Sequence, residues 1–398
     1  MSMSSGGKIT EHLSMGILAQ HYPLSQIREV LKQECKQSIR VRSLPSEVMV
    51  YYLMALGLLM NVSTKEVLRC LVEGLQWLGG AWIQVAGKSA ISQARTKLGV
   101  GPLKALWDQT AKPLAETGAV GSFYKGYRLM ALDGSSMDLP DTLENREHFK
   151  KPGGSFEAGF PQLHLSVLVE CGPHAVLAMK MGSCRDSENA LSGALFGSLK
   201  KGMLCLGDRL YGNYNLWEKA KKTEADFLWR MRMDVSLPVD QVLLDGSFLS
   251  ALYLNAKDRR ERKNGLLVRV VEYEVKEVGG EKSNYRLITS LLDPKEHPAK
   301  ELAQVYVERW EVEGVFDEIK THLRGKKIVL RSKTPLLVEQ EVYGLLLAHR
   351  AVRSLMYRAA VKDQIDPDRL SFTHSVNVIR RKLTSESVFS PSMDESSS

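Results

Sequence analysis

The order of apolar runs between residues 127 and 207 constrains the fold of this chain more than any other feature. Three of these runs have the length of β-strands: 127–132, 163–169 and 175–181. The last two are separated by CysGlyProHis, a composition typical of a hairpin turn. A segment of helical length, 187–199, then leads to a fourth apolar run at 203–207. This order predicts three antiparallel strands, a helix and a fourth strand.

Two carboxylates directly follow apolar runs in this region. Asp133 follows the first run and Asp208 follows the fourth. If these two strands are parallel neighbours, their carboxyl ends meet at one edge of the sheet and the two side chains lie close together. The element order is that of a ribonuclease H-like fold, so we predict an α/β protein with a mixed sheet. An aspartate at a strand end can also be a simple turn residue. Other carboxylates nearby could take either role: Asp138, Asp141, Asp186 and Asp226.

A third carboxylate lies in the stretch YVERWEVEGVFDEIK, residues 306–320. In a regular helix, at about 100° per residue, four polar side chains form one narrow stripe: Tyr306, Arg309, Glu313 and Lys320. An apolar stripe runs beside it, so the helix can pack on a core while it presents charged groups. The simpler alternative is that Arg309 and Glu313 are an ordinary surface i,i+4 pair.

Between Asp208 and Glu313 lie 104 residues, more than a simple connection needs. Residues 226–231 predict a fifth strand, and 235–292 alternate and turn like a β-rich insertion in the same fold. Its clearest strands are 266–275 and 285–292, with a GlyGly turn at 279–280. The basic cluster at 257–263 is expected to be an exposed loop that could contact phosphates.

The first 118 residues are expected to form an all-α domain. Ser63 and Glu66 make a capping box before an apolar-periodic segment. The segment 88–99 could be the second helix of a helix-turn-helix, or only a surface helix of a small bundle. In the first case four of its side chains face DNA: Ser89, Ser92, Gln93 and Arg95.

The net charge of +8 indicates a polyanionic partner. Residues 324–382 hold 13 Lys and Arg against five acidic residues, and helical periodicity in 336–382 makes this segment a candidate for part of a dimer interface. No apolar run approaches the roughly 18 residues of a membrane span, and no signal peptide is evident, so a cytoplasmic protein is expected. Five scattered cysteines without a CxxC pair argue against disulfides and structural zinc.

Three ordered motifs resemble those of the insertion-sequence-four family of bacterial DDE transposases. Its hallmark is Tyr, two residues, Arg, three residues, Glu, six residues, Lys, and this spacing is matched from Tyr306 to Lys320. The family's first acid lies in an Asp-Gly-Ser/Thr context, matched by DGSSMDLPDT from Asp133, and its second in an Asp-Arg-x-Tyr/Phe context, matched by DRLYGNY from Asp208. The similarity covers roughly residues 10–380.

The resemblance implies a function and a site. Asp133, Asp208 and Glu313 would be catalytic and would bind two Mg²⁺ or Mn²⁺ ions per active site. Five residues would contact DNA: Tyr306, Arg309, Lys320, Arg209 and Arg95. The partners would be double-stranded DNA, as terminal inverted repeats and target, and a second copy of the chain in a homodimer, with the protein nucleoid-associated when bound to DNA.

By analogy with the family, the reaction would be cut-and-paste transposition through nicking, hairpin formation, hairpin opening and strand transfer. Hairpin formation extrudes a base, which an aromatic side chain commonly receives. Residues 235–290 contain no Trp, which leaves other aromatics as candidates: Phe248, Tyr253, Tyr273, Tyr285 and the preceding Trp229. Two other classes stay open, namely a DNA-binding protein without catalysis and a metal-dependent nuclease that does not join strands.

The expected organisation has six parts. A helical DNA-binding domain (1–118) precedes the first part of the catalytic core (119–234) and the β-rich insertion (235–292). The second part of the core (293–335), a basic helical region (336–383) and a disordered tail (384–398) follow.

Overall fold

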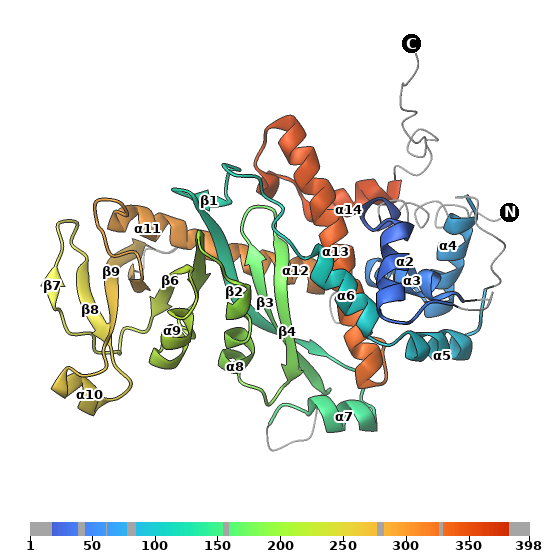
Figure 1. The fold of residues 1–398 in the computed structure, drawn as a ribbon, viewed down its shortest axis with the longest axis horizontal. Helices are drawn as coiled ribbons and strands as arrows, with labels where there is room; N and C mark the ends of the chain where they lie inside the picture. The colour runs from blue at the N-terminus through green and yellow to red at the C-terminus, as the bar shows by residue number, and fades with distance from the viewer. Residues whose placement is uncertain are drawn as a thin grey trace, which may run out of the picture. The chain divides into compact units, whose positions relative to one another are not determined.

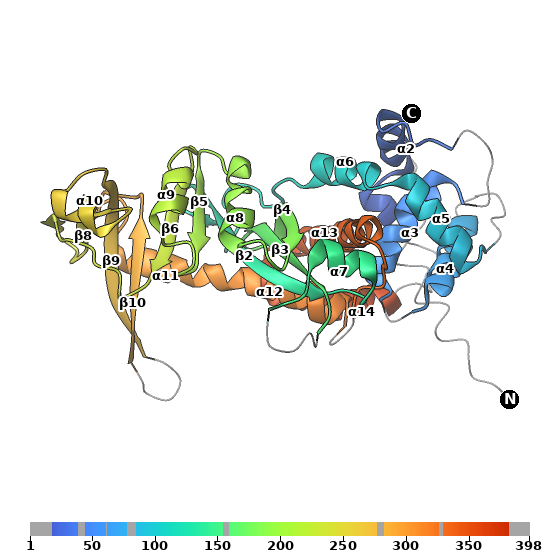
Figure 2. The same cartoon turned by 90° about the horizontal axis from the view of Figure 1, so that it is seen from below.

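A computed structural model of the chain (Figures 1 and 2) describes residues 18–38, 44–60, 62–77, 85–153, 159–276, 282–325 and 329–381. It contains two compact units, each built from separate stretches of the chain. The helical unit comprises Met1–Ala111, Asp138–His148 and Asp317–Ser398, and the sheet unit comprises Lys112–Met137 and Phe149–Phe316. The helical unit thus combines segments from the expected N-terminal domain, catalytic core and C-terminal region.

The N-terminal part of the helical unit is helical, as predicted for its described residues. The α-helices of the whole helical unit are α2 (Leu24–Gln33), α3 (Ser46–Leu58), α4 (Thr64–Trp77), α5 (Lys88–Leu98), α6 (Gly101–Thr110), α7 (Leu143–Phe149), α13 (Pro335–Asp363) and α14 (Phe372–Arg381). The unit also contains the π-helical segment Glu318–Leu323 and the 3₁₀ turn Pro367–Arg369. The Ser63 hydroxyl accepts the backbone N–H of Glu66 at 3.2 Å, one half of the predicted capping box. Residues 7–17 of the expected domain, and the tail from 384, lie outside the described residues.

Helices α3 and α13 pack with their backbones in close approach. A Cβ atom added to Gly344 would lie 2.3 Å from the Leu53 carbonyl oxygen, so only glycine fits there. Helix α3 is apolar and is buried from Val48 to Leu58. The periodic face of α13 is buried as well: Leu345, Leu346, His349, Val352 and Met356. These side chains lie inside the helical unit and do not contribute to a dimer interface, so the proposal that the segment 336–382 forms part of one rests on its other residues and stays a prediction.

The sheet unit contains one mixed sheet. Its strands are β1 (Phe123–Tyr124), β2 (Tyr127–Asp138), β3 (Gln162–Glu170), β4 (Ala175–Ser183), β5 (Met203–Gly207), β6 (Asp226–Met231), β7 (Gln241–Val242), β8 (Phe248–Leu252), β9 (Leu266–Lys276) and β10 (Lys282–Thr289). Their order is β4-β3-β2-β5-β6-β10-β9-β8-β7, with β1 beside β2. Strands β2, β5 and β6 are parallel, and the hairpin of β3 and β4 is antiparallel. The predicted α/β fold with a mixed sheet is confirmed.

The β-rich insertion continues this sheet. Strand β10 pairs antiparallel with β6, with Ile288 opposite Trp229, and β9 and β8 follow in turn. Its predicted glycine turn at 279–280 lies outside the described residues. The basic cluster is exposed but is no loop, since a short helix, α10 (Ala256–Glu261), begins where the Asn255 side chain accepts the Asp258 N–H.

Helices cover both faces of the sheet (Figures 1 and 2). Helices α8 (Glu188–Gly193) and α9 (Tyr214–Ala220) lie on one face, where an aromatic core of Trp217, Phe227 and Trp229 fills the space beneath them. Along the other face run α11 (Ala299–Val305), the 3₁₀ segment η2 (Tyr306–Trp310) and α12 (Glu311–Asp317). The single regular helix predicted over 306–320 is wrong, because its winding changes from 3₁₀ to α to π.

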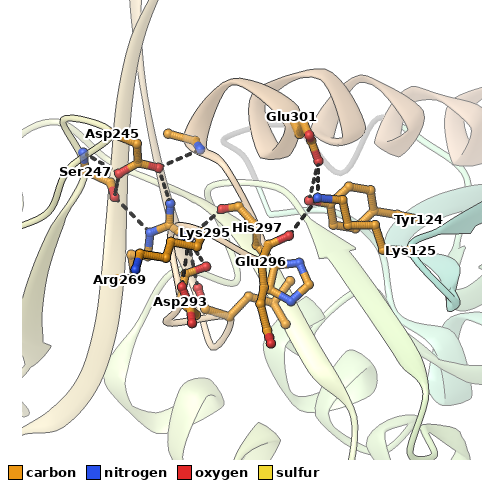
Figure 3. Close-up of polar contacts among 12 residues, drawn as sticks. Tyr124, Lys125, Asp245, Ser247, Arg269, Asp293, Lys295, Glu296, His297 and Glu301 are labelled. Carbon is orange, nitrogen blue, oxygen red and sulfur yellow. Dashed lines mark hydrogen bonds and ion pairs between the residues drawn. The ribbon is translucent and has the colours of Figure 1, made fainter.

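A fully buried arginine joins the insertion to the segment that leads into α11 (Figure 3). The guanidinium of Arg269 donates to the Ser247 hydroxyl at 2.8 Å, to the His297 carbonyl at 2.7 Å and to the Asp245 carboxylate at 2.5 Å. Asp245 also accepts the N–H of Ala299, the first residue of α11. The start of this helix is therefore fixed by charge-assisted hydrogen bonds from the insertion. Among the described residues, no helix combines the length and apolar character needed to cross a membrane.

Candidate active site

The parallel pairing of β2 with β5 brings the two predicted aspartates to the same level of the sheet. Leu132 is the register partner of Gly207, and the next residues are Asp133 and Asp208. Strand β2 itself continues to Asp138, so the prediction that Asp133 ends its strand is wrong. What ends at this point is the pairing with β5, since β5 stops at Gly207. The sheet therefore opens where the two carboxylates stand.

Asp133 is surrounded by other charged groups. Its Oδ1 accepts the N–H of Gly134 at 2.8 Å. Burial raises the pKa of Asp133 to about 6, the Gly134 hydrogen bond opposes this, the charges of Glu188 and Asp208 raise the pKa further, and Arg309 lowers it. Three carboxylates and one guanidinium are thus close enough to act on one another.

Asp208 lies in the turn that follows β5. Its Oδ1 accepts the N–H of Leu210 at 2.7 Å, and this hydrogen bond orients the carboxylate at the start of the turn. Arg209, the neighbouring residue, is exposed and its side chain is accessible to a ligand. The turn ends at the fully buried Tyr211.

Glu313 is on α12, where its side chain is half exposed. An oxygen of its carboxylate lies 3.1 Å from the Nη2 of Arg309, one turn earlier. Arg309 is itself buried, and its Cζ lies 4.2 Å from the centroid of the Trp310 ring. Because the charge of Arg309 also acts on Asp133, this arginine electrostatically links Glu313 to the aspartates of the sheet.

Tyr306 has a different role in the structure from the DNA contact that was predicted for it. Its side chain is buried, and its hydroxyl donates to the Gly207 carbonyl at 3.1 Å. Burial raises the pKa of Tyr306 above its usual range, so the phenol stays protonated. The structure therefore uses this hydroxyl within the protein, on the residue before Asp208, and does not present it for a DNA contact.

Lys320, the last residue of the signature, lies on the π-helical segment Glu318–Leu323 of the helical unit. Burial and the nearby Arg324 lower the pKa of Lys320, and the charge of Asp138 opposes them. The lysine is half-buried, with one cation and one acid acting on its charge.

The expectation that Arg95 faces DNA is wrong. Helix α5 does form, but only 6% of Arg95 is exposed. Its guanidinium donates to the Ser332 hydroxyl at 2.9 Å, the Leu337 carbonyl at 2.7 Å and the Gln340 amide oxygen at 3.2 Å. The arginine therefore joins α5 to α13 inside the helical unit. The other three predicted positions are exposed: Ser89, Ser92 and Gln93.

Two residues near the acids were missed from the sequence. Glu188, the first residue of α8, acts on Asp133 and lines a cavity of about 200 Å³ together with Gly134, Ser135, Ser136, His164 and Ser166. Trp310 is 49% exposed although it is large and apolar. Nothing in the local sequence distinguishes Glu188 from an ordinary acidic residue at a helix start. Trp310 could have been noticed, because it adjoins Arg309 in the signature.

The donor set fits a hard divalent cation. The side chains that gather here offer carboxylate oxygens, the ligands that Mg²⁺ and Mn²⁺ prefer. Burial is the main cause of the raised pKa of Asp133, and the nearby charges of Glu188 and Asp208 add to it; a bound cation would favour the charged carboxylate. Carboxylates from adjacent parallel strands and a facing helix are typical of enzymes that transfer phosphoryl groups with divalent metals.

Comparison with known proteins identifies the family. The model of the transposase DDE domain matches residues 124–350, and that of the insertion element 4 transposase N-terminal region matches residues 12–108. The chain is 28% identical over 362 residues to the transposase InsG for insertion sequence element IS4 of Escherichia coli K12, covering 90% of this chain and 80% of that protein.

Two further proteins are similar to this chain. The putative transposase InsZ of Escherichia coli K12 is 26% identical over 205 residues, which cover 51% of this chain and 66% of that protein. The piggyBac transposase in its synaptic complex with hairpin DNA is 10% identical, with a TM-score of 0.48 over 95% of this chain and 82% of that one.

The chain belongs to the insertion-element-four family of DDE transposases. It is accordingly an enzyme of DNA cleavage and transfer, and membership implies a divalent metal ion and DNA as its partner.

Proposed function

We propose that the protein moves its own insertion element by cut-and-paste transposition: it binds the terminal inverted repeats, nicks them, and joins the freed ends to target DNA. The observation that carries the proposal is the register of β2 and β5, which sets Asp133 beside Asp208. Arg309 links Glu313 to this pair through a 3.1 Å contact and its charge on Asp133. These contacts support the proposal that the three acids of the motifs act together, although more than 70 residues separate each from the next.

Asp133, Asp208 and Glu313 would hold two Mg²⁺ or Mn²⁺ ions. When bound, the metal supplies Lewis-acid activation of the attacking oxygen and stabilisation of the leaving oxygen. The protein's own contribution is to hold the carboxylates in place: Gly134 donates to Asp133, Leu210 donates to Asp208, and Arg309 pairs with Glu313.

The cationic residues of the motifs would bind phosphates of the cleaved strand. Arg209 is exposed next to Asp208, which suits contact with a backbone phosphate. Arg309 is less accessible, and its role would be to orient Glu313 and to add positive charge where the phosphate is attacked. Lys320 would bind a phosphate further along the strand, as the signature implies.

The chemistry would proceed by nicking at each end, attack of the freed 3′-hydroxyl on the opposite strand to give a hairpin, opening of the hairpin by water, and attack on target DNA. The hairpin step needs an aromatic surface for an extruded base. Trp229 cannot supply it because it is fully buried, whereas Trp310 is half exposed beside Arg309. Two ends must be held together during these steps, so a homodimer would be the working form.

A strand-transfer assay tests this proposal. The purified protein is incubated with Mg²⁺, a fragment ending in the element's terminal repeats, and a target plasmid. Nicked ends and joined products are expected. Cleavage without joined product would identify a nuclease, and end binding without cleavage would leave only DNA binding.

A single variant tests the assignment of the acids. Glu313→Ala is expected to bind the ends normally and to lose nicking. The matched control is Glu218→Ala on the exposed side of α9, which should nick at the wild-type rate. Nicking by Glu313→Ala at the wild-type rate would refute the assignment.

A further inference from the structure

A chain of hydrogen bonds joins the turn after Asp208 to helix α8. The buried hydroxyl of Tyr211 donates to Oε1 of Glu188 at 2.8 Å. The same phenol oxygen lies 3.3 Å from the hydroxyl of Ser192, which in turn donates to the hydroxyl of Ser166 on β3 at 3.2 Å. Burial and the charge of Glu188 hold the pKa of Tyr211 well above its usual value, so the phenol keeps its proton and acts as a donor. The turn is thereby fastened to both α8 and β3.

The carboxylate of Glu188 also lies against the residue after Asp133. A Cβ atom added to Gly134 would lie 2.7 Å from Cδ and 2.8 Å from Oε1 of Glu188. Only a residue without a side chain lets the carboxylate approach this closely. The N–H of Gly134 donates to Asp133, and Tyr211 ends the turn that carries Asp208. Glu188 contacts both Gly134 and Tyr211, so it lies between the residues that orient the two aspartates.

We propose that Glu188 is a positioning residue of the active site, which acts through its hydrogen bond from Tyr211 to hold the turn of Asp208 in register with Asp133. This inference deepens the proposed function and rests on it. Groups that orient metal-binding side chains typically change affinity or activity by roughly 10–100-fold when they are removed. Tyr211 is the tyrosine of the Asp-Arg-x-Tyr motif that begins at Asp208, and Glu188, which belongs to none of the three motifs, accepts its hydrogen bond.

Three variants separate a positioning role from a general structural one. Glu188→Gln keeps an acceptor for Tyr211 and removes the charge, whereas Glu188→Ala and Tyr211→Phe each remove the hydrogen bond. We expect Glu188→Gln to nick the element ends at a rate within a few-fold of wild type. The other two variants should be slower by roughly 10–100-fold, with unchanged affinity for the ends. The double variant Tyr211→Phe/Glu188→Ala should be no slower than either single variant, because both remove the same interaction.

Gly134→Ala provides an independent route to the same effect. The substitution keeps the N–H of residue 134, and the backbone there is not in the left-handed region that requires glycine. The new methyl group must, however, displace the carboxylate of Glu188. This variant should also be slow, and adding Tyr211→Phe should slow it little further. Matched controls are Tyr214→Phe, which removes a hydroxyl bonded to the Asn264 carbonyl, and Glu218→Ala; both should nick at the wild-type rate.

The nicking rate is measured across a titration of Mg²⁺, with thermal unfolding of each variant recorded in parallel. A purely structural role would lower the melting temperature and leave the rate of the folded protein unchanged. Equal rates for Glu188→Gln and Glu188→Ala, or a wild-type rate for Tyr211→Phe, would overturn the inference while the wild-type protein still nicks. Absence of metal-dependent nicking by the wild-type protein would instead overturn the proposed function.

Discussion

The hydroxyl of Tyr306 donates a hydrogen bond to the carbonyl oxygen of Gly207, 3.1 Å away. The first residue of the signature is thus attached to the last residue of β5, immediately before Asp208. The segment that leads to Glu313 and the strand that leads to Asp208 are therefore held to each other at one point. The spacing of the signature is explained, in part, by this contact: one turn separates the anchor from Arg309, and a second separates Arg309 from Glu313.

The first prediction concerns this anchor. Tyr306→Phe removes the donor and leaves a buried carbonyl without it, which should reduce the free energy of unfolding by about 1 kcal/mol. Nicking should slow because the contact that joins the segment of Glu313 to the strand before Asp208 is lost, whereas affinity for the element ends should not change. Denaturant unfolding, single-turnover nicking and end binding measure the three quantities. Weaker end binding at an unchanged nicking rate would show that the phenol contacts DNA after all.

The second prediction concerns Lys320. Lys320→Ala should lower the rate of cleavage at the element ends, because one phosphate contact of the cleaved strand is lost, while metal binding stays largely intact. The rate is followed at saturating DNA, and metal binding by the shift in melting temperature that Mg²⁺ produces. The exposed Lys300 on α11 provides the matched control, since Lys300→Ala removes the same charge elsewhere. A larger loss in metal binding than in cleavage would contradict the prediction.

The third prediction concerns the buried Arg269. Arg269→Met removes the guanidinium that joins Asp245 to the carbonyl groups before α11 (Figure 3) and leaves these acceptors unpaired. Breaking a buried ion pair of this kind costs about 3–5 kcal/mol. Unfolding of the sheet unit should occur at clearly lower denaturant concentration, and the exposed Arg260→Met serves as the control. An unchanged transition midpoint would mean that the insertion does not depend on this contact.

The fourth prediction is a pH dependence. His21, just before α2, has its pKa lowered to about 4 by burial and by the charges of Arg350 and Arg358. The unfolded chain binds a proton at about pH 6.5 and the folded protein does not, so stability is lost as the pH falls from 6.5 towards 4. The loss is at most about 3 kcal/mol. His21→Gln should make this part of the stability curve less steep, with the remaining slope due to the buried His349, whose pKa is also lowered; an equally steep loss in the variant would assign it to other groups.

The sequence predicted well those parts of the fold that depend on local pattern. The hairpin of β3 and β4 and the strand β6 have long apolar runs bounded by turn residues, so their positions could be read directly. The acids Asp133 and Asp208 could be inferred because strands β2 and β5 both end their pairing at them. Register and neighbours of the insertion strands could not be inferred, since they depend on pairing between residues distant in sequence.

Tertiary packing decided the features that were missed. Arg95 has the spacing of an exposed helical residue. It is buried because its guanidinium donates to acceptors on α13, some 240 residues later in the sequence. The change of winding after Tyr306 also depends on packing, because the apolar spacing alone favours one regular helix. The sequence around Glu188 does not mark this residue as functional. Its proposed role depends only on its contacts with Gly134 and Tyr211, which are distant in sequence.

The close packing of α3 against α13 has a consequence for biosynthesis. Helix α3 is apolar on all sides, and the helix that covers it begins at Pro335. At translation rates of about 5–20 residues per second, the nascent N-terminal helices wait for tens of seconds before that cover is made. During this interval the side of α3 that α13 later covers stays exposed, which makes the nascent chain prone to aggregation. A chain truncated before α13 should therefore be removed by proteases instead of accumulating as a free fragment that competes for DNA.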